Sequence, residues 1–170
     1  MDNLLYFGET EERIQEIEAI LAKEFVITNL GKSNYYLGMN MIYNRTKGIY
    51  HLHQTKYIDR IIARSGLGPL KTVKTPIQAG QKLTKAKDQI VNKEDILRYS
   101  SLVNSINYLA IITRPDILYT VSHLSQFLTN PTKEHFDIVT RVYTYINTTK
   151  GLGLIYLIGK PGLTEYINTN

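Results

Sequence analysis

The chain has 170 residues, 43% of them hydrophobic, a net charge of +5 and no cysteine. This length and composition suit one domain, or two small ones sharing a core. The lack of cysteine excludes a disulfide framework, a thiolate metal site and a cysteine nucleophile. No apolar run approaches the roughly 20 residues of a membrane span, and the N-terminus is acidic rather than signal-like. We therefore expect an intracellular protein without a membrane partner, in either the cytoplasm or the nucleus.

The charges are distributed unevenly along the chain. Residues 1–24 hold seven acids and two basic residues, whereas residues 25–87 hold eleven basic residues and the single acid Asp59. Residues 88–170 hold seven of each sign. A basic stretch of this kind is typical of a surface that lies along a phosphate backbone, although a solvated basic surface without a partner has the same composition.

The chain begins with a predicted strand and a predicted helix. Leu4–Phe7 is a short apolar run ended by Gly8, which is typical of a buried strand. Thr10 is a favourable N-cap, and acids follow it in the first turn, where the helix dipole favours them. Apolar residues then recur at helical spacing, which predicts an amphipathic helix over 11–24.

A β-hairpin and a second helix are predicted next. Residues 35–43 and 49–53 are rich in aromatic and β-branched side chains and flank a turn at 44–48. Helical spacing returns at 54–64, and Gly66 follows directly as a stop signal.

The second half of the chain is predicted to be mainly helical. Residues 65–93 carry glycine, proline and six lysines without a clear period, which indicates an extended basic connector. Three helices follow: one over about 94–112, one from Pro115, and one capped by Asn130-Pro131. Two strands are predicted after them, at 154–158 and 163–167. The predicted fold class is therefore α+β.

Short sequence words occur in a fixed order over nearly the whole chain. They are Leu30-Gly31, Tyr36-Leu37-Gly38-Met39, Gly48-Ile49, His53-Gln54-Thr55-Lys56-Tyr57-Ile58, Thr75-Pro76, Tyr99–Leu109, Thr113-Arg114-Pro115-Asp116-Ile117, Leu124-Ser125-Gln126-Phe127, Pro131, His135 and Gly151–Tyr156. Their order and spacing resemble the segment after the polymerase active site of copia-type retrotransposon reverse transcriptases. Asn104, where the family has glycine, and residues 144–149 depart from the family pattern.

The resemblance implies three parts. Residues 1–53 would be a C-terminal palm remnant with palm-edge strands and a primer-grip hairpin. Residues 54–130 would be a thumb-like helical region with the basic connector. Residues 131–170 would be the connection and the start of a sheet like that of ribonuclease H.

The resemblance also places remnants of two active sites at the ends of the chain. Asp2 stands at the first position of the family's magnesium-binding aspartate pair and Asn3 at the second. Asn168 and Asn170 stand where the ribonuclease H strand has acids. An amide is a weaker ligand than a carboxylate for a hard cation, so we expect Asp2 to be non-functional, or simply a frayed terminal residue.

Two candidate nucleic-acid-binding features remain. Tyr36, Leu37 and Gly38 resemble the primer grip, in which a turn presses on the primer phosphates, but Tyr36 and Leu37 could equally be core residues of a hairpin. A stripe on the second helix suits a duplex backbone, or is a solvated helix face; its members are Lys56, Arg60 and Arg64.

Two other groups carry weaker signals. His51 and His53 share one side of a strand but lack a third ligand, so no metal site is predicted. Arg114 and Asp116 are interpreted as an ion pair that fixes a helix start.

The function implied by the resemblance is RNA-directed DNA synthesis within a retrotransposon polyprotein. For this chain alone we expect no activity and no cofactor, although the intact family enzyme uses Mg²⁺. The expected partners are an RNA or DNA duplex or primer–template, bound without sequence specificity, and the missing palm and ribonuclease H parts. The alternatives are a domesticated nucleic-acid-binding or interaction module, and one part of a split active polymerase.

Overall fold

The structure is a computed structural model that describes residues 4–6, 8, 10–44, 46–81, 83–84 and 91–157. Several predictions concern residues outside this set, namely the remnants Asp2 and Asn3, the strand at 163–167, Asn168 and Asn170, and the connector lysines Lys82, Lys85 and Lys87. None of the helices in the described part combines the length and apolar character that crossing a bilayer requires.

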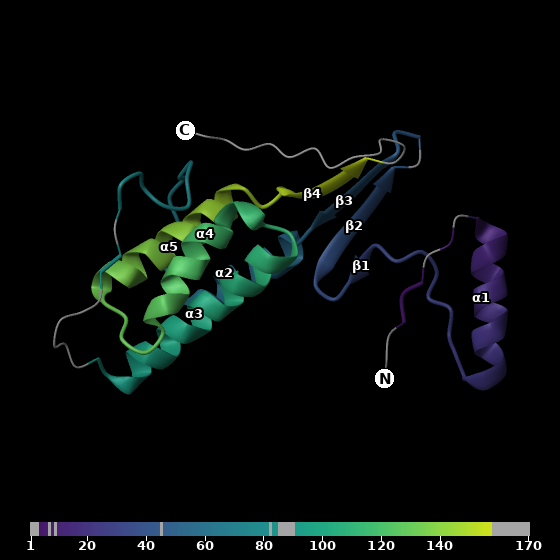
Figure 1. Cartoon of the computed structure of the whole chain (residues 1–170), viewed down its shortest axis with the longest axis horizontal. Coiled ribbons are helices and arrows are strands. Elements are labelled where there is room, and N and C mark those ends of the chain that lie inside the picture. The colour runs from purple at the N-terminus through teal and green to yellow at the C-terminus, as the bar shows by residue number, and fades with distance from the viewer. Residues whose placement is uncertain are drawn as a thin grey trace.

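The largest part of the molecule is a group of helices at one end, on the left in Figure 1. Its members are α2 (Thr55–Ser65), α3 (Lys93–Ile112), α4 (Leu118–Leu124) and α5 (Lys133–Thr148), with short 3₁₀ turns at Pro115–Ile117 and Ser125–Phe127. One apolar cluster runs through all of them, and Ile58, Ile106 and Val142 are fully buried in it. Burying each such side chain contributes roughly 1.5–3 kcal/mol, so this cluster is the main source of stability.

The helix limits follow from local signals. α2 ends at Gly66, whose φ of 63° is the left-handed conformation that glycine adopts without cost. Asn92 caps α3 by accepting a hydrogen bond from Asp95 N at 2.7 Å. The expected cap Asn130-Pro131 of the last helix is wrong. Thr132 caps α5 instead, in a capping box. Its hydroxyl accepts a hydrogen bond from His135 N, and the His135 ring accepts one from Thr132 N.

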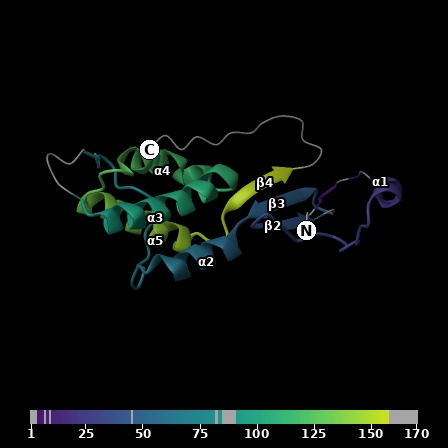
Figure 2. The ribbon, with the colours of Figure 1, turned by 90° about the horizontal axis from the view of Figure 1, so that it is seen from below.

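A four-stranded antiparallel sheet extends from one end of the helices (Figure 2). Its strands, in spatial order, are β1 (Tyr35–Tyr36), β2 (Met39–Asn44), β3 (Ile49–His53) and β4 (Gly153–Leu157). The strand predicted at 35–43 is therefore two strands, β1 and β2, joined by a turn. β4 pairs with β3 across about 100 residues of chain, with Tyr50 opposite Tyr156. Gly153 permits this pairing, since a Cβ there would overlap the carbonyl oxygen of Leu52. The fold is α+β, as predicted.

The N-terminal segment behaves differently from its prediction. Helix α1 (Glu11–Glu24) has its predicted limits and its Thr10 cap, yet none of its residues is buried. It lies apart from α2–α5, near the far end of the sheet (Figure 1). The strand expected at Leu4–Phe7 is wrong for residues 4–6, which belong to no strand, while Phe7 lies outside the described residues. A strand needs a partner for its backbone groups, and no described strand pairs with this segment.

Candidate nucleic-acid interface

The predicted primer-grip residues form a tight turn between β1 and β2. Leu37 and Gly38 both have positive φ, of 46° and 82°, and Tyr36 pairs with Met39 on either side of them. Two positive φ values are the signature of a type I′ hairpin turn. Gly38 suits this conformation, but for Leu37 it is strained. The Leu37 side chain is 66% exposed, so it is not a core residue.

The predicted basic stripe lies on the outer face of α2. Lys56, Arg60 and Arg64 are all exposed, whereas Ile58 and Ile61 on the opposite face are buried in the core. Burial of the apolar face fixes the direction of the stripe, because residues three and four apart share one side of a helix.

The structure brings the turn and the stripe together. The Lys56 ammonium lies 5.0 Å from the ring centre of Tyr35, directly before the turn, and the Arg60 guanidinium lies 5.3 Å from the ring of Tyr57. Such cation–π contacts hold the stems of long basic side chains in place. Tyr35 is a member of this surface that the sequence reasoning had not singled out.

Tyr108 on α3 is a second residue that the sequence reasoning missed. Its hydroxyl donates to the carbonyl oxygen of Leu37 at 2.6 Å, and its ring packs edge-on against Tyr57 with 5.1 Å between centres. Burial raises the pKa of Tyr57, and the neighbouring Tyr108 raises it further. Tyr108 lies at the border between the buried and the exposed face of its helix, and this position is the only signal in the sequence that could have suggested such a role.

The only acid between residues 25 and 87 is neutralised by the C-terminal half of the chain. Asp59 lies on α2, and its carboxylate forms an ion pair with Lys150 at 2.5 Å. Lys150 follows α5, whose C-cap is Thr149. Asp59 therefore offsets a lysine from elsewhere rather than the stripe residues on its own helix.

The described part of the connector is held against the helices by packing and hydrogen bonds, unlike a freely extended basic segment. Leu67, Leu70 and Val73 pack against the core. The Arg141 guanidinium on α5 donates to the carbonyl and hydroxyl oxygens of Thr75 at 3.1 and 3.0 Å. Lys71 and Lys74 nevertheless remain exposed, so the connector presents them at defined positions.

The described residues do not form a metal centre. No group of three His, Cys, Asp or Glu side chains among them could hold an ion. The His51 and His53 rings lie 4.9 Å apart on one face of β3. Burial, together with His51, lowers the pKa of His53. Thr55 donates its hydroxyl to the Lys150 carbonyl, so the His53 Nδ1–H donates to Thr55 at 2.7 Å. This hydrogen bond occupies one nitrogen of the histidine pair.

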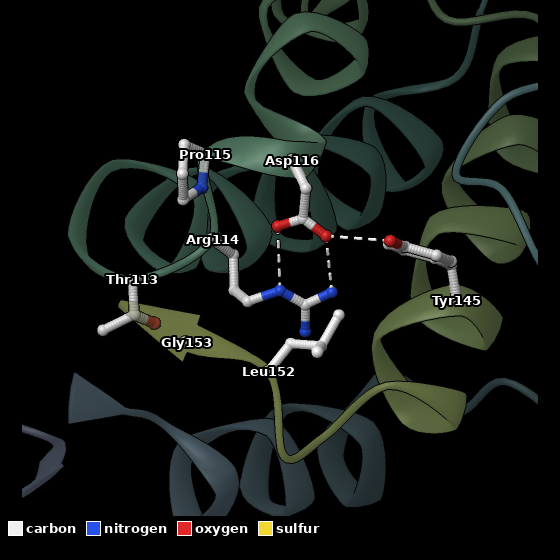
Figure 3. Close-up of a pocket in the computed structure, with 7 residues that line it drawn as sticks. All are labelled: Thr113, Arg114, Pro115, Asp116, Tyr145, Leu152 and Gly153. Carbon is white, nitrogen blue, oxygen red and sulfur yellow. Dashed lines mark hydrogen bonds and ion pairs between the residues drawn. The ribbon is translucent and has the colours of Figure 1, made fainter. Parts of the chain in front are cut away.

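A pocket of about 230 Å³ lies at the junction of α3, α5 and β4 (Figure 3). In it Arg114, only 1% exposed, forms two hydrogen bonds to the Asp116 carboxylate at 2.8 and 2.9 Å. The same guanidinium donates to the backbone oxygen of Thr149 at the end of α5, and Tyr145 donates to Asp116. Burial alone would raise the pKa of Asp116, but the contacts with Arg114 lower it below its usual value. The predicted ion pair is confirmed. Its residues connect the segment before α4 to α5 by hydrogen bonds, so the pocket has a structural role.

Comparison with known proteins indicates a family for this chain. Residues 1–79 match the family described as reverse transcriptase (RNA-dependent DNA polymerase). The whole chain is 33% identical to a retrovirus-related Pol polyprotein from transposon TNT 1-94 of Nicotiana tabacum, of which it covers 13%. The whole chain is also 30% identical to a putative transposon Ty5-1 protein of Saccharomyces cerevisiae, of which it covers 54%. Over 91% of its length it is 31% identical to a Pol polyprotein from transposon RE1 of Arabidopsis thaliana, of which it covers 10%. No solved structure matches the chain.

These findings support a reverse transcriptase fragment. More narrowly, they support a fragment of a copia-type retrotransposon reverse transcriptase, similar in sequence to a segment of the Pol polyprotein. The chain spans between a tenth and about half of the length of these relatives. The matches favour a reverse transcriptase segment over a domesticated module or a split polymerase.

Proposed function

We propose that this segment supplies a non-specific nucleic-acid-binding surface to RNA-directed DNA synthesis. The surface consists of the turn at 36–38 and the stripe Lys56, Arg60 and Arg64. Its ligand is an RNA or DNA duplex, or a primer–template. The observation that carries the proposal is the Lys56–Tyr35 contact, which joins two separate basic or aromatic segments into one exposed surface.

The physical basis is the phosphate charge of the ligand. Lys and Arg side chains that neutralise phosphates release condensed counterions, which favours binding without reading the sequence. The guanidinium groups of Arg60 and Arg64 suit two-point contacts with phosphate oxygens, and Lys56 acts as a point charge. Leu37 is exposed and Gly38 has no side chain, so the backbone of the turn can approach the ligand closely.

We further assign the parts of the family enzyme to this chain as its sequence order suggests. Residues 1–53 are the end of the palm, 54–130 the thumb, and 131–170 the connection leading to ribonuclease H. The helical character of α2–α4 supports a thumb. The pairing of β4 with β3 means that the proposed connection, after α5, adds a strand to the sheet of the hairpin.

The family's magnesium chemistry does not fit the described residues of this chain. In the family enzyme Mg²⁺ aligns the primer hydroxyl and the incoming triphosphate. Asp2, the candidate ligand, lies outside the described residues, and the described residues contain no group of three His, Cys, Asp or Glu side chains that could hold an ion. We therefore assign this segment a role in holding the duplex and none in the chemical step.

The test is the salt dependence of duplex binding by the 170-residue chain. Replacing Lys56, Arg60 and Arg64 together with Glu is expected to reduce the slope of log affinity against log salt by about 2.7, since each contact with a duplex phosphate contributes roughly 0.9. Fluorescence anisotropy of a labelled duplex between about 50 and 200 mM salt measures the slope. Sequence preference should not change.

A matched variant controls for total charge. Lys93, Arg98 and Lys133 are also exposed but lie on α3 and α5, so their joint replacement with Glu changes net charge equally. Its slope should stay close to that of the unaltered chain. Equal slopes for the two triple variants would mean that binding follows total charge, and the proposed surface would be wrong.

A further inference from the structure

We propose that Tyr108 is a positioning residue that holds the turn at a fixed place beside the basic stripe. The inference rests on the proposed function and adds a residue from α3, far from both binding segments in the sequence. Tyr108 would act through the backbone of the turn, as the link that makes two surface segments one site.

The first observation is the hydrogen bond itself. The Tyr108 hydroxyl donates to the Leu37 carbonyl oxygen at 2.6 Å, across 71 residues of chain. A Cβ added at Gly38 would lie 3.5 Å from the same hydroxyl. The tyrosine is therefore bonded to one central residue of the turn and lies beside the other.

The second observation is the conformation that the hydrogen bond restrains. Leu37 has a φ of 46°, which is unfavourable for a residue with a branched side chain. Strained backbone of this kind persists only where surrounding contacts hold it, and it concentrates at sites that bind ligands. The Leu37 side chain is 66% exposed, so its own packing contributes little to holding the turn. The contact from Tyr108 supplies that restraint.

The third observation is the continuation of the contact to the stripe. The Tyr108 ring packs edge-on against Tyr57 of α2, and Tyr57 donates its hydroxyl to the Ser105 carbonyl on α3 at 3.0 Å. The Arg60 guanidinium lies over the same ring, 5.3 Å from the Tyr57 ring centre. A continuous set of contacts thus runs from Leu37 through Tyr108 and Tyr57 to Arg60.

Holding the turn and the stripe at a fixed separation has a direct consequence for binding. Two contact segments on one rigid frame bind a duplex more tightly than two that move independently, since the second contact then needs no further ordering. Removing the Tyr108 hydroxyl should free the turn while leaving every charged group in place. Affinity should therefore fall without a change in the number of phosphates contacted.

The experiment compares Tyr108→Phe with Tyr143→Phe in the 170-residue chain. Each variant loses one tyrosine-to-carbonyl hydrogen bond, because Tyr143 donates to Leu102 within the core at 3.2 Å. Tyr108→Phe is expected to bind duplex about two- to tenfold more weakly, the range of one ordinary hydrogen bond, with an unchanged salt slope. Amide exchange of residues 37–39, measured without nucleic acid, should accelerate. Tyr143→Phe should alter neither the affinity nor this exchange beyond about twofold.

A second substitution separates positioning from direct contact. Leu37→Gly removes the strain of the turn, so adding it to Tyr108→Phe should recover part of the lost affinity. No recovery, or an altered salt slope, would indicate that Tyr108 contacts the nucleic acid itself and would overturn the positioning role. Unchanged affinity in Tyr108→Phe would overturn it too, while leaving the proposed surface intact. Failure of the unaltered chain to bind duplex would overturn both.

Discussion

Single buried polar residues tie the helices of this molecule together. Arg114 uses its guanidinium to join Asp116 at the start of the α4 region to Thr149 at the end of α5. A cation is also favoured near the C-terminal end of a helix, where backbone carbonyls carry partial negative charge. Removing one partner of such a pair leaves a buried charge without compensation, so the Arg114–Asp116 motif needs both residues for structural reasons alone.

His135 is expected to make the stability of the protein depend on pH. The residue is fully buried at the start of α5, and its Nδ1 accepts a hydrogen bond from Thr132 N at 2.9 Å, so it is neutral in the folded chain. Burial lowers its pKa below the ordinary 6.5, and Glu134 opposes this only in part. A lowered folded pKa means that the unfolded chain takes up the proton first. The free energy of unfolding is therefore expected to be highest above about pH 6.5 and to fall as the pH drops below that value.

Urea unfolding of two variants at about pH 7.5 and 5.5 tests this origin of the pH dependence. His135→Gln keeps an acceptor for Thr132 N but does not titrate, so it should show a smaller loss between the two pH values. Some loss should remain, since the pKa of His53 is lowered as well. Thr132→Ala should lose roughly 1 kcal/mol at both pH values while keeping the full pH dependence. Equal pH dependence in His135→Gln and the unaltered chain would contradict the prediction.

At the scale of elements, α1 and the helices α3–α5 have very different support. α1 has good caps and regular spacing, yet its apolar residues Ile14, Ile17 and Leu21 are only half-buried and Phe25 is 64% exposed. An isolated helix of about this length is marginal in water, because the free-energy cost of nucleating a helix exceeds the gain from a few hydrogen-bonded turns. By contrast, α5 contributes eight residues to the buried part of the molecule.

Amide hydrogen exchange is expected to divide the chain accordingly. Residues 94–147 should be the better protected half, and the first fifty residues, with α1 and the short β1, should exchange quickly. α5 provides an internal reference, since its 16 residues are close to the 14 of α1. Slower exchange in α1 than in α5 would mean that α1 is buried in solution, for example against another copy of the chain.

At the scale of the whole molecule, the family resemblance does not imply an active enzyme. The 170-residue chain is expected to show no magnesium-dependent primer extension. Asn3 stands where the family has its second aspartate, and the part of the chain that the structure describes holds no group of three His, Cys, Asp or Glu side chains that could bind an ion. Without these ligands the several kcal/mol that a metal contributes to the transition state are lost.

Incorporation of labelled nucleotide on a primed homopolymer template, compared with heat-killed protein, measures this activity. Asn3→Asp alone should not restore it, because one carboxylate does not complete a two-metal site. Incorporation above the heat-killed control in the unaltered chain would show that the acidic residues needed for catalysis are present after all.

The sequence by itself determined the local elements and the family. Helices α1, α2 and α3 lie within one residue of their predicted limits, because caps, stop signals and apolar spacing act over a few residues. The cap of the last helix was predicted at Asn130-Pro131 and lies at Thr132 instead. The true cap depends on how the His135 side chain turns back towards the backbone, which the sequence does not show. The ordered words of the family carried the identification that the comparisons confirm.

Only the tertiary structure decided which distant segments meet. The contacts of Tyr108 with Leu37, of Lys150 with Asp59 and of β4 with β3 join residues separated by 71 to about 100 positions. No local pattern marks such pairs, because each depends on the packing of the intervening helices rather than on the residues beside it in the chain. The same holds for α1, whose spacing indicates an inward face although none of its residues is buried in the described structure.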